Sequence, residues 1–317
     1  MVHDTQVRMK ELKMSEFHTG LVHTPVTPFK ADGSIDYETY GKLLDFHLTH
    51  GADCLALPMH AGESVSLTDA ERRELLEFAV KRVRGRVPVV AHVSESGTAM
   101  AAELARHAER AGASAIVATT PYYWTPPAGM LLEHFAQIGA ATRLPYFVYN
   151  TPEELPGNKV TTDLVLKLIE RLPTFAGLVD ASLDWQFMIQ VIAAGQRARS
   201  GFQLISGTEY MVSAGAIGAT GVFAPLAGVA PTLVRELYEH FRNDRHHEAR
   251  AVQEAVAELR EVAHRASVAG LKAAMRAMGR DCGAPRPPLE ALSRSEAQEL
   301  ERRLGNLDAL RATPRGW

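Results

Sequence analysis

The chain has 317 residues, of which 46% are hydrophobic and 22% are charged, and its formal net charge is -3. This is the composition of an ordinary globular protein, and the mild acidity does not indicate binding to nucleic acid or to an anionic membrane. No apolar run approaches the ~18 residues that a membrane span needs. Residues 1–17 lack the apolar core of a signal peptide, so we interpret them as an N-terminal extension. Cys54 and Cys282 are far apart, which favours free thiols and a cytoplasmic location.

Short apolar runs recur along the chain, and longer segments with helical periodicity separate them. The runs are continuously apolar rather than alternating, which is typical of parallel strands that are covered on both faces. The runs are residues 20–29, 54–58, 87–93, 114–120, 144–150, 175–180, 202–207 and 221–225. Eight strand–helix units predict an α/β protein with a (β/α)8 TIM barrel. The alternative is an open doubly wound sheet, although no glycine-rich nucleotide fingerprint follows the first run.

Local signals mark the helix ends. Thr68 can cap a helix, and Glu71 three residues later completes a capping box. The segments HGADCLALP, AGASAIVAT and IGATGVFAP share a helix-ending glycine followed by an apolar strand, which indicates one recurring unit. After residue 230 the strand-like runs stop. We therefore expect an N-terminal extension at 1–17, the barrel at 18–240 and a C-terminal helical region at 241–317.

In barrels of this type the working side chains follow the carboxyl ends of the strands. Here those positions include His60 and His92, which follow neighbouring strands, together with Tyr149 and Asp180. Two imidazoles at one rim can act as acid and base near neutral pH, or can help to hold a divalent metal. The alternative is that they are hydrogen-bonded rim residues with no chemical role.

The order of several motifs resembles that of a known family. VTPF follows the first strand, GES..LT..ER.ELL follows the second, and TPYY and YNTP end the fourth and fifth. GL.DAS.D ends the sixth, GATGVFAP...VAP the eighth, and G...G.PRPPL lies near the C-terminus. Over residues 18–311 the chain is similar to the dihydrodipicolinate synthase / N-acetylneuraminate lyase family.

The resemblance implies a class I aldolase-type barrel that is usually a tetramer. In that family a lysine on the sixth strand forms a Schiff base with a 2-oxo acid, which creates an electron sink. Tyr149 matches the family's proton-relay tyrosine, and Tyr123 matches the tyrosine that completes the relay across a subunit interface. Gly62 and Glu63 match the end of the carboxylate-binding loop.

Four positions depart from the family pattern. Val179 stands where the resemblance places the lysine, and His60 and Ala61 replace two threonines of the loop. Glu154 stands where the synthase subgroup has an arginine. The changes come together, which favours a natural divergent branch over a single knockout. No other lysine is expected to serve, because Lys42, Lys81 and Lys167 fall on outer helices, Lys159 beyond the fifth strand and Lys272 in the C-terminal region.

These observations predict an aldolase-like or hydratase-like lyase that acts on a small 2-oxo acid, or on a related carbonyl compound, without a Schiff base and without authentic dihydrodipicolinate synthase activity. The alternative is a catalytically silent homologue that binds a small metabolite or serves as a structural or regulatory subunit. The predicted catalytic residues are Tyr149, Tyr123 and His60. The predicted substrate-binding residues are Ala61, Gly62, Thr24, His92, Val179, Asp180, Gly207 and Thr208. We expect no cofactor, with a divalent metal as the lesser alternative, and a homo-oligomer that binds neither nucleic acid nor a membrane.

Overall fold

The computed structural model describes residues 17–122, 124–151, 159–264 and 267–317. Eight parallel strands form a closed barrel in which each strand pairs with its neighbours in sequence and β8 pairs with β1. The strands are β1 Leu21–His23, β2 Cys54–Leu57, β3 Val89–His92, β4 Ala115–Thr119, β5 Tyr146–Asn150, β6 Phe175–Asp180, β7 Gln203–Ser206 and β8 Gly221–Ala224. The prediction of a (β/α)8 barrel is confirmed, and the closure between β1 and β8 excludes the open sheet.

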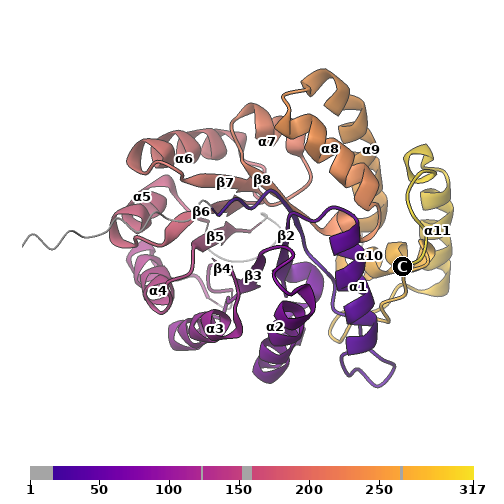
Figure 1. The fold of residues 1–317 in the computed structure, drawn as a ribbon, viewed down its shortest axis with the longest axis horizontal. Helices are drawn as coiled ribbons and strands as arrows, with labels where there is room; N and C mark the ends of the chain where they lie inside the picture. Colours follow the sequence, from indigo (N-terminus) through magenta and orange to yellow (C-terminus); the bar gives the residue numbers. More distant parts are fainter. Residues whose placement is uncertain (1–16, 123, 152–158, 265–266) are drawn as a thin grey trace, which may run out of the picture.

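Helices surround the barrel, one after each strand (Figure 1). They are α1 Tyr37–Thr49, α2 Asp69–Val83, α3 Thr98–Ala111, α4 Ala128–Ala140, α5 Thr162–Arg171, α6 Trp185–Ala198, α7 Met211–Ala216 and α8 Pro231–Arg242. The capping box of α2 is present, with the Glu71 N–H donating to the Thr68 hydroxyl at 3.2 Å. The repeated glycines Gly51, Gly112 and Gly218 all have φ between 84° and 95°, a left-handed conformation that glycine adopts at little cost.

The first strand is shorter than the sequence predicts. The apolar run at 20–29 forms a strand only from Leu21 to His23, and its remainder is a loop. Pro25 and Pro28 have no N–H to donate to a strand ladder, so the run cannot continue as a strand of the barrel. The strand predicted at 20–29 is therefore wrong in length, and the observed strand is Leu21–His23.

The barrel interior is a packed apolar core. Its buried members are Val22, Cys54, Ala56, Met59, Val90, Ala115, Val117, Phe147, Ala176, Val179, Ile205 and Phe223. Both cysteines are free and buried. Since the interior is filled, any space for a ligand lies above it, at the rim formed by the carboxyl ends of the strands.

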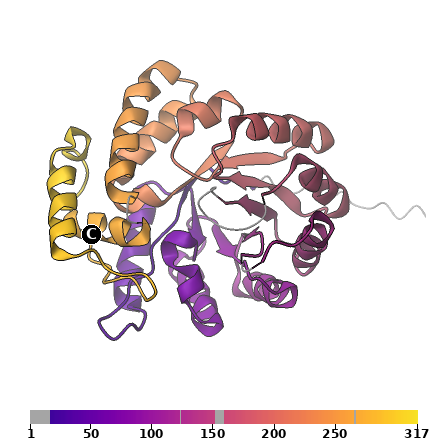
Figure 2. The same ribbon diagram turned by 180° about the vertical axis from the view of Figure 1, so that it is seen from behind.

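The C-terminal helices lie against one side of the barrel. They are α9 His246–His264, α10 Ser267–Ala277 and α11 Arg294–Gly305, and α9 packs on α8 (Figure 1). Seen from behind, α11 forms the outermost layer on this side (Figure 2). α10 also contacts the short 3-10 helix η1, His60–Gly62, which follows β2. The segment beyond the barrel therefore reaches the rim where a site is expected.

None of the helices in the described part of the chain is long and apolar enough to span a membrane.

Candidate active site

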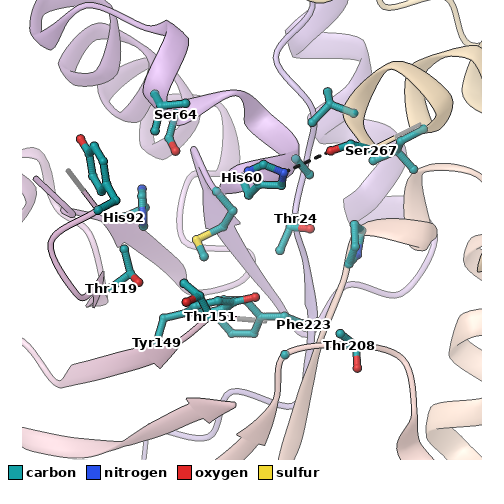
Figure 3. A pocket seen from close by; sticks show the side chains of 18 of the residues that line it. Thr24, His60, Ser64, His92, Thr119, Tyr149, Thr151, Thr208, Phe223 and Ser267 are labelled. Atoms are coloured by element: carbon teal, nitrogen blue, oxygen red, sulfur yellow. Dashed lines mark hydrogen bonds between the residues drawn. The ribbon is translucent and has the colours of Figure 1, made fainter. Parts of the chain in front are cut away.

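A cavity of about 370 Å³ lies at the carboxyl ends of the strands. This volume falls within the range of small-molecule sites, about 300–1,000 Å³. Figure 3 shows His60, His92, Thr24 and Tyr149 around it. The described residues that line it are Thr24, Met59, His60, Ala61, Ser64, Val65, His92, Thr119, Thr120, Tyr122, Tyr149, Thr151, Gly207, Thr208, Phe223, Pro225, Arg260, Ser267, Val268 and Leu271.

His60 stands at the start of the loop after β2. Its Nε2 lies 3.3 Å from the Ser267 hydroxyl of α10, a contact that ties the loop to the C-terminal helices (Figure 3). Its ring is exposed to the cavity, yet the surrounding protein still desolvates it. This desolvation lowers the pKa of His60 below its usual value, and the carboxylate of Glu63 offsets the shift only in part. The imidazole is therefore neutral at neutral pH.

His92 ends β3 and is more enclosed. Its Nε2 lies 2.7 Å from the Ser94 hydroxyl, which also accepts the Thr119 N–H at 2.8 Å. Burial, followed by the nearby Arg72 guanidinium, lowers the pKa of His92 to about 3. His92 is thus a neutral hydrogen-bonding group at the cavity wall, and near neutral pH it is not a source of positive charge.

Tyr149 contributes its ring and hydroxyl from β5. The ring packs against Phe223, with 6.3 Å between the centroids. Desolvation raises the pKa of Tyr149 above its usual value, while the positive charge of Arg260 acts in the opposite direction. The phenol is therefore protonated at neutral pH and available as a donor to a ligand.

Val179 lies in register beside Tyr149, on the neighbouring strand β6. Its side chain is completely buried in the barrel interior with Ile205 and does not line the cavity. Lysine is absent from the described residues around the cavity. The resemblance places a lysine at this position, and among the described residues neither the surroundings of Val179 nor the cavity lining provides an amine in its place.

Asp180 is not among the residues that line the cavity. Its carboxylate accepts hydrogen bonds from Asn150 Nδ2 at 2.6 Å and from the Ser182 hydroxyl and N–H at 2.8 and 3.1 Å. Burial raises the pKa of Asp180 above its usual value, although these hydrogen bonds oppose the shift. These hydrogen bonds join β5 to the turn after β6.

The loop after β2 is a pair of tight turns. Gly62 and Glu63 donate their N–H groups back to Met59 and His60, and the Thr27 hydroxyl donates to the Gly62 carbonyl at 2.7 Å. The backbone at Glu63 is left-handed, with φ 57°. Gly62 thus stabilises the loop through its backbone hydrogen bonds, whereas Ala61 lines the cavity.

Glu63 connects this loop to the C-terminal region. Its Oε1 lies 2.6 Å from Lys272 Nζ of α10, and its Oε2 accepts the Arg286 N–H at 2.8 Å. The Lys272 ammonium also lies over the Phe29 ring. Both partners come from the C-terminal region, more than 200 residues away in sequence.

A second buried carboxylate, that of Glu209, connects the rim after β7 to the C-terminal helices. Glu209, just after β7, accepts the Leu226 N–H at 2.9 Å and pairs with Arg260 Nη1 of α9 at 2.9 Å. The Glu209 side chain is completely buried, whereas that of Arg260 is 19% exposed and reaches the cavity. The preceding residues Gly207 and Thr208 line the cavity as well, and the Thr208 hydroxyl is buried with no hydrogen-bond partner among the described residues.

The cavity gathers most of the residues that the sequence singled out. His60, Tyr149, Ala61, Thr24, His92, Gly207 and Thr208 line it, whereas Gly62, Val179 and Asp180 do not. Tyr123 and Glu154 lie outside the described residues. In the described part of the chain no three His, Cys, Asp or Glu side chains are grouped closely enough to hold a metal ion.

The sequence missed the wall that the C-terminal helices contribute. Arg260, Ser267, Val268 and Leu271 line the cavity from α9 and α10. Their helical periodicity indicated only an appendage, because a helix pattern does not say which neighbour covers its apolar face. A basic residue such as Arg260 on an otherwise apolar stripe was the available signal.

Comparisons with known proteins agree with the fold. Residues 17–307 match the sequence model described as the Dihydrodipicolinate synthetase family. A 4-hydroxy-tetrahydrodipicolinate synthase of Caldicellulosiruptor bescii is 31% identical over 281 residues, which cover 88% of this chain and 93% of the relative. An uncharacterized DapA-like lyase of Halobacterium salinarum is 32% identical over 296 residues, which cover 92% of this chain and 94% of the relative.

A solved structure is similarly close. The prophage protein YagE of E. coli K12, which belongs to the dihydrodipicolinic acid synthase family and was solved in complex with pyruvate, superposes with a TM-score of 0.86. It is 25% identical, and the alignment covers 92% of this chain and 99% of that protein.

Proposed function

Because this chain belongs to the dihydrodipicolinate synthetase family, we propose that it is a lyase that acts on a small 2-oxo acid, or on a related carbonyl compound, without forming a Schiff base. The family and the lyase relatives support the reaction class. The pyruvate bound to YagE supports a 2-oxo acid as the ligand type. The finer part of the proposal, the absence of an imine, rests on the residues of this chain.

The observation that carries the proposal is the composition of one cavity. It contains a neutral phenol, Tyr149, and a neutral imidazole, His60, on opposite sides, while the β6 position beside Tyr149 is the buried Val179 (Figure 3). An imine needs a primary amine within reach of the substrate carbonyl. Lys272 is the lysine nearest in sequence to the cavity wall, and its ammonium is held by Glu63 with only 2% of the side chain exposed.

Tyr149 and His60 suit a retro-aldol cleavage of a hydroxylated 2-oxo acid. In the tautomer whose Nε2–H donates to Ser267, the free Nδ1 of His60 takes the proton of the substrate hydroxyl. The adjacent carbon–carbon bond breaks, an aldehyde leaves, and the bond electrons form the enolate of the 2-oxo acid. The Tyr149 phenol donates a hydrogen bond to the enolate oxygen, and the proton on His60 then returns to the enolate carbon.

A trapping experiment tests the absence of an imine. The protein is incubated with pyruvate and borohydride and is then weighed by mass spectrometry. We expect the mass of the unmodified chain, because no lysine lines the described cavity. A stoichiometric adduct that carries the reduced three-carbon unit would refute the proposed mechanism.

Turnover assays test the lyase itself. A panel of hydroxylated 2-oxo acids is screened for cleavage and dehydration, with and without added divalent metal. Activity that is lost in both Tyr149→Phe and His60→Ala would support the two roles. Activity that survives both substitutions would reject the roles assigned to these residues.

The second candidate is a silent homologue that binds a small metabolite. The apolar character of much of the cavity wall favours it, since Met59, Phe223 and Leu271 bind but do not react. Stabilisation of the protein against heat by a carbonyl compound, without turnover of any panel member, would identify this function instead.

We also propose that the protein is a cytoplasmic homo-oligomer. Four large apolar side chains, Met100, Tyr122, Trp124 and Met130, are between 37% and 57% exposed on the α3–α4 side, where a second copy would cover them. Light scattering during size-exclusion chromatography measures the assembly directly, and Trp124→Ser is expected to weaken it. The two free cysteines fit a reducing compartment.

A further inference from the structure

Arg260 stands out among the side chains that line the cavity. The described lining residues include no aspartate, no glutamate and no lysine, and the two histidines are neutral near pH 7 because their pKa values are lowered. Arginine is always protonated in proteins. Within the described lining, Arg260 therefore provides the permanent charge, and that charge is positive.

The guanidinium is fixed but not fully used. Glu209 holds Nη1 at 2.9 Å, and the Tyr210 ring lies 5.9 Å from the guanidinium carbon. The helix that carries Arg260 is docked by Gln253, whose Nε2 donates to the Glu209 carbonyl at 2.8 Å. An arginine has five N–H donors, and among the described residues Glu209 accepts from only one nitrogen. For the remaining donors, the described residues provide no hydrogen-bond partner.

A buried polar group accompanies the cation. Thr208, which directly precedes Glu209, is 5% exposed, and its hydroxyl has no hydrogen-bond partner among the described residues. A buried hydroxyl without a partner is costly, because its hydrogen bonds to water are lost on folding. A ligand oxygen at this end of the cavity would compensate both the hydroxyl and the free donors of Arg260.

The rest of the wall calls for an apolar ligand surface. The apolar lining residues are Met59, Ala61, Val65, Phe223, Pro225, Val268 and Leu271. The cavity volume of 370 Å³ corresponds to roughly twelve water molecules at about 30 Å³ each, about twice the number of non-hydrogen atoms in pyruvate. Pyruvate alone would leave much of this wall uncovered.

We propose that Arg260, held by Glu209, binds the carboxylate of the substrate, and that the substrate is a 2-oxo acid with an apolar arm that covers the wall formed by Phe223, Val268 and Leu271. This inference rests on the proposed function, because it names the substrate class of the same cavity. In a 2-oxo acid the carbonyl is directly bonded to the carboxylate carbon. A carboxylate bound to Arg260 therefore brings the ketone carbonyl toward Tyr149. The positive charge of Arg260 acts on the Tyr149 hydroxyl, where it opposes the rise in pKa that desolvation causes.

Binding rather than turnover tests this assignment. Calorimetry measures the affinity of the full-length protein for 4-methyl-2-oxopentanoate, for pyruvate and for the amide of 4-methyl-2-oxopentanoate, which lacks the charge. We expect the branched acid to bind more tightly than pyruvate and than the amide. In Arg260→Gln we expect the affinity for the acid to fall by about tenfold to hundredfold, as for a lost charge-assisted hydrogen bond, and the affinity for the amide to stay the same. Unchanged binding of the acid by Arg260→Gln overturns the proposal.

Two further variants separate this role from folding. Arg260→Gln leaves the buried Glu209 charge without a partner, so the double variant Glu209→Gln/Arg260→Gln removes both charges and is tested beside it. Arg260→Lys keeps the positive charge and is expected to retain part of the affinity. Arg250→Gln, on an exposed position of the same helix, is the matched control and should bind like the wild type.

The outcomes are separable from those of the lyase proposal. Arginine-dependent binding of the branched acid, with no turnover of any panel member, keeps Arg260 as the anchor and rejects the lyase. Turnover with a KM that Arg260→Gln does not change keeps the lyase and rejects the anchor.

Discussion

Glu63 and Glu209 occupy similar places at two parts of the barrel rim. Each follows a strand, each side chain is completely buried, and each pairs with a cation from the C-terminal helices. The cations differ. Lys272 is 2% exposed and also donates to the Ala284 carbonyl, whereas Arg260 is 19% exposed and lines the cavity. The same local design thus serves as a structural bond in one place, and in the other it leaves donors available to a ligand.

The difference depends on the shape of the cation as well as on its burial. A lysine ammonium is a compact charge, and Glu63, Phe29 and Ala284 surround it. An arginine guanidinium is a planar fork that can bind a protein carboxylate along one edge and a second anion along another. We therefore expect substitutions at the first pair to affect stability and substitutions at the second to affect recognition.

The largest predicted effect tests the structural pair. Lys272→Met leaves the Glu63 carboxylate buried without its partner, and breaking such a pair costs about 3–5 kcal/mol. Urea unfolding followed by circular dichroism measures the loss. Lys42→Met is the matched control, because Lys42 forms an exposed pair with Glu38 at 2.8 Å and should change little. Equal stability of the two variants would show that the buried pair is not structural.

The next effect tests the side of the rim assigned to chemistry. Tyr149→Phe removes the hydroxyl that would stabilise the enolate, so turnover should fall by about 10²- to 10³-fold with the fold unchanged. The control on the same strand is Tyr146→Phe, since Tyr146 is buried against Phe175 and does not line the cavity. If both variants lose activity equally, the loss reflects packing of β5 rather than chemistry at Tyr149.

The third prediction concerns how stability depends on pH when an imidazole, that of His47, is buried without a carboxylate to stabilise its charged form. Burial, followed by the charges of Arg280 and His50, lowers the pKa of His47 to about 3, and its Nδ1 lies 3.0 Å from that of His23. Above pH 6.5 the ring is neutral in both folded and unfolded chains, so it causes no pH dependence. As the pH falls from 6.5 to about 3, only the unfolded chain takes up a proton at His47. The free energy of unfolding should therefore decrease by up to about 1.4 kcal/mol for each pH unit.

Urea unfolding at a series of pH values measures this slope. In the described part of the chain, the groups that face His47 are His23, His50, Arg280 and the Phe46 ring, and none of them is a carboxylate that would stabilise the imidazolium. His47→Gln should make the decline of stability with acid shallower. An unchanged slope would mean that burial at this position does not exclude the proton.

The smallest predicted effect is at Val179. Val179→Lys introduces an amine where the resemblance places the family's lysine, but Ala61 and Glu154 still differ from the family pattern, so we expect no gain of dihydrodipicolinate synthase activity. The measurement is condensation with pyruvate as substrate. A robust gain from this single change would show that the other departures matter less than the missing lysine.

The barrel was predictable because its signals are local. The capping box at Thr68 and Glu71 and the left-handed glycines Gly51, Gly112 and Gly218 each define a helix end without reference to the rest of the fold. Repetition of one strand–helix unit then limits the architecture to few choices. The length of β1 was missed because the apolar run continues through prolines that cannot join a ladder.

The site was predictable only where it follows the strands. His60, His92 and Tyr149 fall at strand ends, and register alone places them at one rim. The partners of Glu63 and Glu209 are 209 and 51 residues away in sequence, so no spacing rule could find them. The sequence could not show that Asp180 lies outside the cavity lining, because a carboxylate after a strand can turn toward Asn150 and Ser182 as easily as toward a ligand.

The position of α9 and α10 has a consequence for how such a protein can change. The strands and their helices end before residue 246, whereas the wall that holds Arg260, Val268 and Leu271 is encoded entirely after it. Part of the wall that we propose selects the substrate is therefore encoded apart from the barrel strands, although Phe223 contributes from β8. A chimaera that carries the last helices of a relative on this barrel should inherit the relative's selectivity while keeping Tyr149 and His60, provided that Glu63 and Glu209 find their cations.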